Sequence, residues 1–197
     1  MLKVFYQTKE NKSFYEQKDI QYDMLINSVT GSEPVTTSEA KDWGLIDTSA
    51  EDTLIGTMIT SVREALETYI SRDIVARNRT YYIEYVDCST IDLPFAPIDA
   101  VSSVTYGDDD DALTVNSDYY VRGVSDKRIE LVSYPKEYVK VTYTTLGLSD
   151  QSVKDAIKAT FEYLYDSRGL VSQDNFKGFS IPETAKKLIV GHRTMFI

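Results

Sequence analysis

The spacing of the hydrophobic residues changes twice along this chain, and the change restricts the folds that it can adopt. Over residues 50–70 apolar side chains recur at every third or fourth position, which is the period of one helix face. Over residues 78–145 the period falls to two, and turn-forming residues separate short apolar runs, as in antiparallel strands. The helical spacing returns over residues 150–168 and 182–192. We therefore predict an α+β fold, in which N-terminal and C-terminal helices form a small core and an antiparallel β-sheet or sandwich region is inserted between them.

Turn-forming residues also indicate how the chain is divided. The sequence Thr-Gly-Ser-Glu-Pro breaks the chain at residues 30–34, and a short helical pattern follows at residues 37–43. Ser49 and Asp52 have the spacing of a capping box at the start of the long helix, with Asp in place of the preferred Glu. We predict an N-terminal arm, a main domain and a C-terminal tail, which span residues 1–33, 34–193 and 194–197.

The net charge of −10 argues against a protein that grips nucleic acid or anionic membranes. Both kinds of binding need Lys and Arg side chains against phosphate groups, although an acidic wall can surround DNA without retaining it. No apolar run is long enough to cross a membrane, and the first residues lack the apolar stretch of a signal peptide. The single cysteine, Cys88, cannot form an internal disulfide. We expect it to be a semi-buried filler in a protein that is assembled in a reducing, intracellular compartment.

The sequence offers few residues for catalysis or for binding a metal or cofactor. His192 is the only histidine, so a Ser-His-Asp or Cys-His arrangement would have to use it, and no nucleophile motif accompanies it. One His and one Cys cannot supply a zinc site made of those ligands, and neither phosphate-binding glycine motif is present. We expect no enzyme activity and no cofactor. A carboxylate-dependent hydrolase remains an alternative, because the chain contains 31 acidic residues.

Four consecutive aspartates form the most unusual motif of the chain. They follow Gly107 and are Asp108, Asp109, Asp110 and Asp111. Adjacent residues of an extended chain point in opposite directions, and the ligand spacing of an EF-hand loop is missing. We interpret the run as an exposed acidic loop at the tip of a hairpin. A weak cation site is the alternative, and it would fit a β-rich binding module that recognises a carbohydrate or receptor with the help of Ca²⁺.

A series of short motifs extends through the main domain in a fixed order. In the helical part they are Pro34–Lys41 (PVTTSEAK), Leu45–Asp47, Asp52–Ile55, Arg63–Glu64, Glu67–Tyr69 and Arg72. In the β region and beyond they are Leu93–Ile98 (LPFAPI), Val101–Tyr106 (VSSVTY), Val139–Tyr143, Gly147, Asp155–Ile157, Tyr165–Arg168, Ile181–Pro182, Leu188–Ile189 and Arg193. In this order the motifs resemble those of the phage head–tail connector proteins, also called head-completion or adaptor proteins. Two features depart from the family pattern: Ser71 stands where the family often has glycine, and the arm over residues 1–33 is longer than usual.

The resemblance implies a structural virion protein of the neck, assembled in the cytoplasm of the host bacterium. Members of this family form a ring, usually a dodecamer, that docks on the portal protein and receives the next neck or tail protein. The ring extends the DNA channel and surrounds phage DNA without sequence-specific binding, and it does not contact a membrane. Head-to-tail contact around a ring requires two different adhesive faces on each subunit. The 15 tyrosines suit such interfaces, because a tyrosine ring packs while its hydroxyl group forms a hydrogen bond.

The C-terminal segment is the candidate for portal contact. After Glu183 it contains basic residues and no acidic residue, and it ends in apolar side chains. The candidate contact residues are Lys186, Lys187, Arg193, Met195, Phe196 and Ile197. The alternative is a frayed terminus without a binding role.

Overall fold

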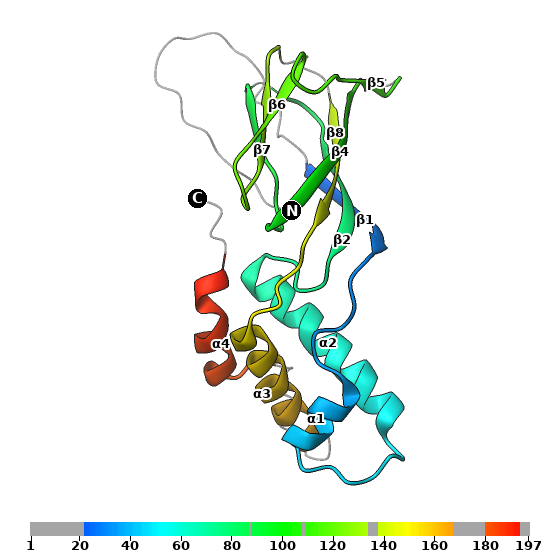
Figure 1. Ribbon diagram of the computed structural model, residues 1–197, viewed down its shortest axis with the longest axis vertical. Helices are drawn as coiled ribbons and strands as arrows, with labels where there is room; N and C mark the ends of the chain where they lie inside the picture. Colours follow the sequence, from blue (N-terminus) through cyan, green and yellow to red (C-terminus); the bar gives the residue numbers. More distant parts are fainter. Residues whose placement is uncertain (1–21, 87, 108, 134–137, 168–179, 194–197) are drawn as a thin grey trace, which may run out of the picture. The chain divides into compact units, whose positions relative to one another are not determined.

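The computed structural model describes residues 22–86, 88–107, 109–133, 138–167 and 180–193. The chain separates into two compact units (Figure 1). The β unit comprises Met1–Ser28, Asn78–Leu93 and Ile98–Thr144, and the helical unit comprises Val29–Arg77, Pro94–Pro97 and Thr145–Ile197. Residues 1–21 of the predicted arm and the predicted tail 194–197 lie outside the described residues.

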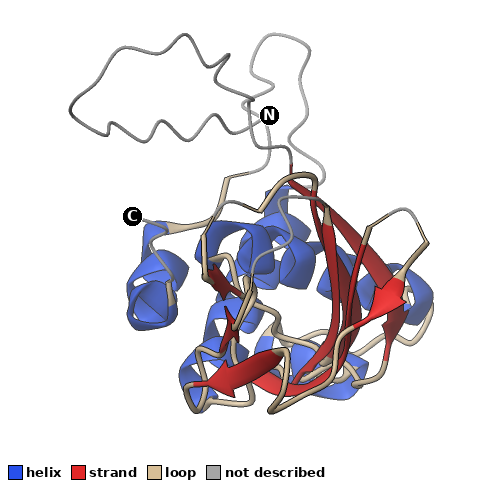
Figure 2. Cartoon of the chain, turned by 90° about the horizontal axis from the view of Figure 1, so that it is seen from above, coloured by secondary structure: helices blue, strands red, loops and turns tan. Residues whose placement is uncertain are grey.

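The predicted α+β class is confirmed, because the chain combines helices with two antiparallel sheets, and the strands from β2 to β8 are inserted between α2 and α3. Figure 2 distinguishes the strands, in red, from the helices, in blue. The larger sheet has the order β1 (Tyr22–Val29), β2 (Arg77–Ile83), β8 (Val139–Thr145), β4 (Ile98–Tyr106) and β5 (Asp111–Ala112). The smaller sheet has the order β3 (Thr90–Asp92), β7 (Arg128–Leu131) and β6 (Tyr119–Arg122). The helices are α1 (Thr37–Trp43), α2 (Asp52–Ile70), α3 (Gln151–Ser167) and α4 (Glu183–Ile189), and a short 3₁₀ helix, η1, spans Val190–His192.

Alternating burial along β8 explains how the larger sheet forms its core. Val139, Val141 and Tyr143 are buried, while the residues between them are partly exposed. β8 is paired antiparallel with β2, so that Val139 lies opposite Ile83, which is also buried. A period of two with one apolar face is what a strand in a half-buried sheet requires. The sequence from residue 139 to 145 therefore dictates both the strand and the face that it buries.

A glycine closes the hairpin between β6 and β7 in the smaller sheet. Gly123 has a φ angle of 94°, and a Cβ atom at this position would lie 2.3 Å from the carbonyl oxygen of Asp126. Only glycine adopts this turn without strain. The hairpin brings Ile129 and Leu131 into the buried interior of the β unit. Burial also raises the pKa of Tyr119, which lies opposite Leu131 in the β6–β7 pair.

The helical unit has a core that comes from one face of each helix. α3 packs against α1, α2 and α4 (Figure 1). The large, fully buried apolar side chains from α2 and the later helices include Ile55, Val62, Leu66, Ile70, Val153, Ile157, Phe161 and Ile189. Burial of each such side chain contributes about 1.5–3 kcal/mol relative to leaving it exposed. None of the described helices combines the length and the apolar composition that crossing a bilayer requires.

Capping occurs at the short first helix instead of the long second one. The Thr36 hydroxyl accepts the backbone N–H of Glu39 at 3.2 Å, and the Glu39 carboxylate accepts the Thr36 N–H at 2.8 Å. This capping box lowers the pKa of Glu39 below its ordinary value of 4.5, chiefly through the hydrogen bond from the Thr36 backbone. The predicted box of Ser49 and Asp52 is wrong, because α2 begins at Asp52 and its N-cap residue makes no side-chain hydrogen bond.

Candidate functional site

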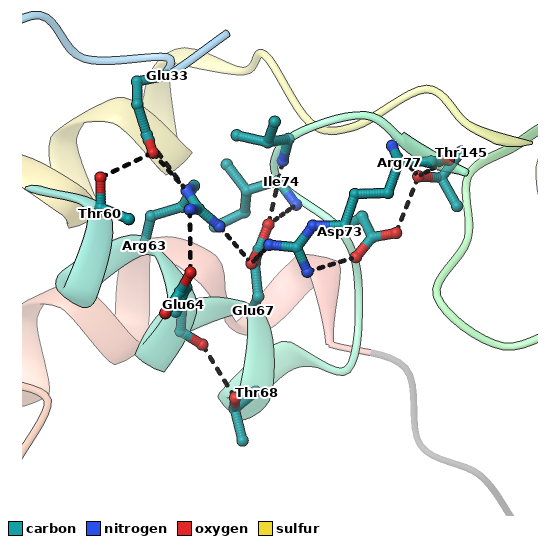
Figure 3. A network of polar contacts seen from close by, with 11 residues as sticks. Glu33, Thr60, Arg63, Glu64, Glu67, Thr68, Asp73, Ile74, Arg77 and Thr145 are labelled. Carbon is teal, nitrogen blue, oxygen red and sulfur yellow. Dashed lines mark hydrogen bonds and ion pairs between the residues drawn. The ribbon is translucent and has the colours of Figure 1, made fainter. Parts of the chain in front are cut away.

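A buried network of ion pairs is the most extensive polar cluster of the helical unit, and Glu67 lies at its centre (Figure 3). One oxygen of this carboxylate accepts the backbone N–H groups of Ile74 and Val75 at 2.9 and 3.1 Å. The other oxygen accepts the guanidinium groups of Arg63 and Arg77, both at 2.7 Å. The four donors occupy both oxygens. Glu67 therefore fixes the end of α2 to the chain segment that leads into β2.

Further acidic and hydroxyl groups complete the network at its two ends (Figure 3). Arg63 also binds the Glu33 carboxylate through Nε, at 2.9 Å. Arg77 also lies 3.4 Å from Asp73. Asp73 accepts the Thr145 hydroxyl at 2.8 Å, and that hydroxyl in turn accepts the Arg77 backbone N–H at 3.0 Å. The network thus joins residues before α2, within it and after it to the end of β8.

Electrostatics identify the network as a structural device. Burial disfavours the charged form of Arg63, but the carboxylates of Glu67 and Glu33 outweigh this effect and raise the pKa of Arg63 above its ordinary value. Each carboxylate and guanidinium group already has a partner of opposite charge within the cluster. Groups that are paired in this way stabilise one conformation of the chain. The Nε atom of Arg77 is buried in the same cluster without a hydrogen-bond partner among the described residues.

The described part of the aspartate run lies in the turn and strand after β4. Asp110 has a φ angle of 55° and forms an ion pair with Lys140 of β8. The hydrogen bond from Lys140 is the main reason that the pKa of Asp110 is lowered, and the pKa of Lys140 is raised by the same contact. Asp108 lies outside the described residues. Within the described segments no group of three or more His, Cys, Asp or Glu side chains is arranged to hold a metal ion.

The structure places His192 next to a serine and an aspartate, but not in the geometry of a catalytic triad. Its Nε2 atom lies 3.4 Å from the Ser152 hydroxyl and 3.9 Å from the Asp150 carboxylate. In a triad the serine and the acid contact opposite nitrogens of the imidazole, so that the acid orients the ring toward the nucleophile. Here both neighbours face the same nitrogen. The three residues form a polar contact between η1 and the start of α3.

The basic residues proposed for portal contact lie on and after α4. Lys186 pairs with Glu183 at 2.5 Å, and this hydrogen bond raises the pKa of Lys186 and lowers that of Glu183. Lys187 is exposed on the same helix. The Arg193 guanidinium lies over the ring of Tyr69, 5.2 Å from its centroid, so a cation–π contact holds it at the end of α2. The remaining candidates, Met195, Phe196 and Ile197, lie outside the described residues.

The expectation for Cys88 is wrong. The side chain is exposed instead of semi-buried, and its thiol donates to the carbonyl oxygen of Thr90 at 3.2 Å. Cys88 lies in the connection between β2 and β3, outside the alternating runs whose inward positions are buried. Connecting segments usually run over the protein surface, so a residue in this connection is expected to be exposed.

The comparison with known families agrees with the resemblance seen in the sequence. The head completion protein family matches residues 33–194, and the chain belongs to this family. No curated protein sequence matches the chain.

Solved structures of gene transfer agent (GTA) particles contain chains with the same fold. A chain from the virion of a native GTA particle is 16% identical, with a TM-score of 0.69, and the match covers 88% of this chain and 96% of that one. A chain from the neck of an empty GTA particle, computed with C6 symmetry, is 16% identical, with a TM-score of 0.66 and coverage of 90% and 97%. A chain from the neck of a native GTA particle, computed with C12 symmetry, is 14% identical, with a TM-score of 0.61 and coverage of 88% and 97%. At these identities the similarity shows a shared fold.

Proposed function

We propose that this protein is a structural, non-catalytic subunit of the phage neck, which links the head to the tail. The observation that carries the proposal is the match to the head completion protein family over residues 33–194. The fold shared with chains of GTA virions and necks, over nearly the whole of this chain, supports it. The proposed place of action is the neck of the virion, after assembly in the cytoplasm of the host bacterium.

The proposed assembly is a ring of identical subunits, with twelve as the expected number. The C6 and C12 symmetries used for the GTA necks support a cyclic arrangement. A ring with one subunit type needs a heterologous contact, in which one face of each copy binds a different face of the next. The proposed neighbours along the neck axis are the portal protein on one side and the next neck or tail protein on the other.

The C-terminal segment is proposed to contact the portal. Lys187 is exposed on α4, and the cation–π contact of Arg193 with Tyr69 sets the position from which the last four residues start. A basic segment with an apolar end can bind an acidic, apolar groove through both charge and burial. The proposed contact residues are Lys186, Lys187, Arg193, Met195, Phe196 and Ile197.

The ring is proposed to extend the DNA channel without holding the DNA. Each copy carries a net charge of −10, and a polyanion is repelled by an acidic wall. Binding of DNA would instead require basic groups that displace counterions from the phosphates. The isolated ring is therefore expected not to retain duplex DNA at physiological salt, in a filter-binding or gel-shift assay.

Native mass spectrometry of the full chain, alone and with the portal protein of the same phage, tests the proposal. The expected result is a cyclic oligomer or an oligomer bound to the portal. Deletion of residues 194–197 and the substitution Lys187→Glu should each abolish or strongly weaken portal association, while circular dichroism shows an unchanged fold. Arg128→Glu is the matched control, because it makes the same charge change at an exposed position of β7. A monomer that never associates with the portal would refute the proposed function.

A further inference from the structure

The outer edge of β1 is an open edge of the larger sheet. β1 is the last strand on its side, and none of the described segments supplies a further strand beyond it. Seven of its eight residues are exposed, including Leu25 at 52% and Ile26 at 46%. Soluble proteins usually protect such an edge with a lysine, a proline or a very short strand. The segment Tyr22–Val29 has none of these protections, so it can accept another strand.

The opposite side of the same sheet also has an open stretch, along the first half of β4. β5 covers only Thr105 and Tyr106, at the far end of β4. The N–H of Ile98 bonds to a loop carbonyl and the carbonyl of Val104 accepts the N–H of Leu113, so these two residues point backbone groups away from β8. The carbonyl of Ala100 instead accepts the Thr144 hydroxyl of β8 at 3.4 Å. Ala100 and Ser102 lie between Ile98 and Val104 and are exposed. Within the described residues no strand other than β8 pairs with β4 at these two positions, so the side away from β8 is open there.

Strand direction makes the two open edges compatible with each other. Asn27 bonds to the side chains of Asn78 and Thr80, and Tyr22 stacks on Tyr81, so residue numbers rise along β1 as they fall along β2. β2 and β8 are antiparallel. The N–H of Gly107 bonds to Tyr138 and Ala100 contacts Thr144, which makes β4 antiparallel to β8. The directions alternate from β1 to β4. A second copy in the same orientation would therefore present β4 antiparallel to β1 and continue the alternation.

Side chains at the two edges also suit each other. Ile26 shares a face of β1 with Met24, whose sulfur atom lies 3.9 Å from the hydroxyl of the buried Tyr143. Ala100 shares a face of β4 with Ile98, which is buried. Even-numbered positions of both strands thus lie on the core side of the sheet. Pairing would place the exposed Ile26 over small residues of the partner and remove apolar surface from water.

We propose that β1 of one copy pairs antiparallel with residues 99–103 of β4 in a second copy, so that the sheets of neighbouring subunits join edge to edge. This inference rests on the proposed function, because a ring supplies the second copy in the required orientation. Contact between two different edges is heterologous and can close a ring. Contact of β1 with β1 would be two-fold and would end at a dimer.

Disulfide trapping between two singly substituted proteins tests the pairing. Ile26→Cys and Ala100→Cys are made separately in a Cys88→Ser background, and Ser102→Cys covers the neighbouring register. The proteins are combined with the portal protein, oxidised and examined on a non-reducing gel. The expected result is a covalent dimer when the Ile26→Cys protein is mixed with one of the β4 variants, and none from any variant alone. Dimers from Ile26→Cys alone would overturn the proposal in favour of two-fold pairing.

A lysine substitution at the open edge provides a second measurement. Leu25→Lys should lower the fraction of protein in rings by about tenfold or more, because a charged side chain blocks edge pairing. Val124→Lys is the control, because this residue is 87% exposed at the tip of the β6–β7 hairpin. If rings form normally with Leu25→Lys, and the mixed cysteine variants give no covalent dimer, the inference is overturned. The proposed function is unaffected by that result. Absence of any ring or portal complex from the unsubstituted chain overturns the inference together with the proposed function.

Discussion

Replacing Glu67 with glutamine removes one negative charge from the centre of the buried network while preserving the size of the side chain. Glu67 is 3% exposed and accepts four hydrogen bonds, two of them from Arg63 and Arg77 at 2.7 Å. Glutamine has only one acceptor oxygen, and its NH₂ group would face two of the N–H donors that the carboxylate now accepts. Arg63 keeps Glu33 as a partner, whereas Arg77 keeps only the longer contact with Asp73 at 3.4 Å.

The size of the effect follows from leaving buried positive charge without its main partner. Breaking a buried ion pair on one side costs about 3–5 kcal/mol. In a chain of this length each kcal/mol lowers the melting temperature by about 2–4 °C, so the loss for Glu67→Gln is roughly 6–20 °C. The free energy of unfolding is measured by urea titration at 25 °C and the melting temperature by calorimetry.

Glu64 supplies the matched control for this experiment. Its side chain is 61% exposed and lies 3.4 Å from Arg63, so it contributes a surface contact to the same guanidinium group. Glu64→Gln should change the free energy of unfolding by less than about 1 kcal/mol. Equal losses for Glu64→Gln and Glu67→Gln, or an unchanged unfolding curve for Glu67→Gln, would refute the argument from burial.

Three further substitutions test local features of the helical unit. Ser71 ends α2 with a left-handed φ of 55°. Ser71→Gly should therefore raise the free energy of unfolding by about 0.5–1 kcal/mol in urea titration. A lower free energy of unfolding would contradict the backbone argument. Gly147 has a φ of 77°, and a Cβ atom there would lie 2.6 Å from the Ile74 carbonyl oxygen. Gly147→Ala should therefore lower the free energy of unfolding by about 2–3 kcal/mol in the same assay. An unchanged free energy of unfolding would contradict this prediction. Because the capping box lowers the pKa of Glu39, its stabilisation is present above pH 4.5 and is lost as the pH falls through the lowered value. The stability gap between the unsubstituted chain and Glu39→Gln should be about 0.3–0.5 kcal/mol at pH 7 and should vanish in acid, and a gap independent of pH would contradict this reading.

The helices could be predicted from the sequence because each buries one apolar stripe. The spacing that predicts a helix at residues 50–70 is the spacing of the buried residues of α2, such as Ile55, Val62 and Leu66. Caps were harder to predict, since Thr36 and Ser49 both precede an acidic residue at the correct distance. Only the residue that has a non-helical backbone directly before a helix can act as the cap, and that residue is Thr36.

The strands could be located by their period of two, but their pairing could not be derived from it. β2 lies beside β8, about 60 residues later in the chain, and β1 comes from the segment predicted as an arm. Pairing between distant strands depends on how their apolar faces meet in space, and an alternating pattern does not specify its partner. The open edges of the sheet were therefore not visible in the sequence.

The buried charge network could not be predicted in full from the sequence, although the sequence contains a signal for it. Arg63 and Glu67 are four residues apart and lie next to Val62 and Leu66 in the apolar stripe of α2. Charged residues at that spacing beside an apolar stripe can neutralise each other inside a core. The partners Glu33, Asp73 and Thr145 come from distant parts of the chain, and only the fold brings them to Arg63 and Arg77.

Temperature changes the contribution of this network relative to the apolar core. Removing charges from water becomes less unfavourable as a solution is heated, because the hydration of ions carries a strongly negative entropy. The ion pairs around Glu67 should therefore contribute more near the melting temperature than at 25 °C. Glu67→Gln should therefore reduce the free energy of unfolding more when it is measured by calorimetry at high temperature than by urea titration at 25 °C. The difference between the two values measures how strongly heating favours buried charge in this protein.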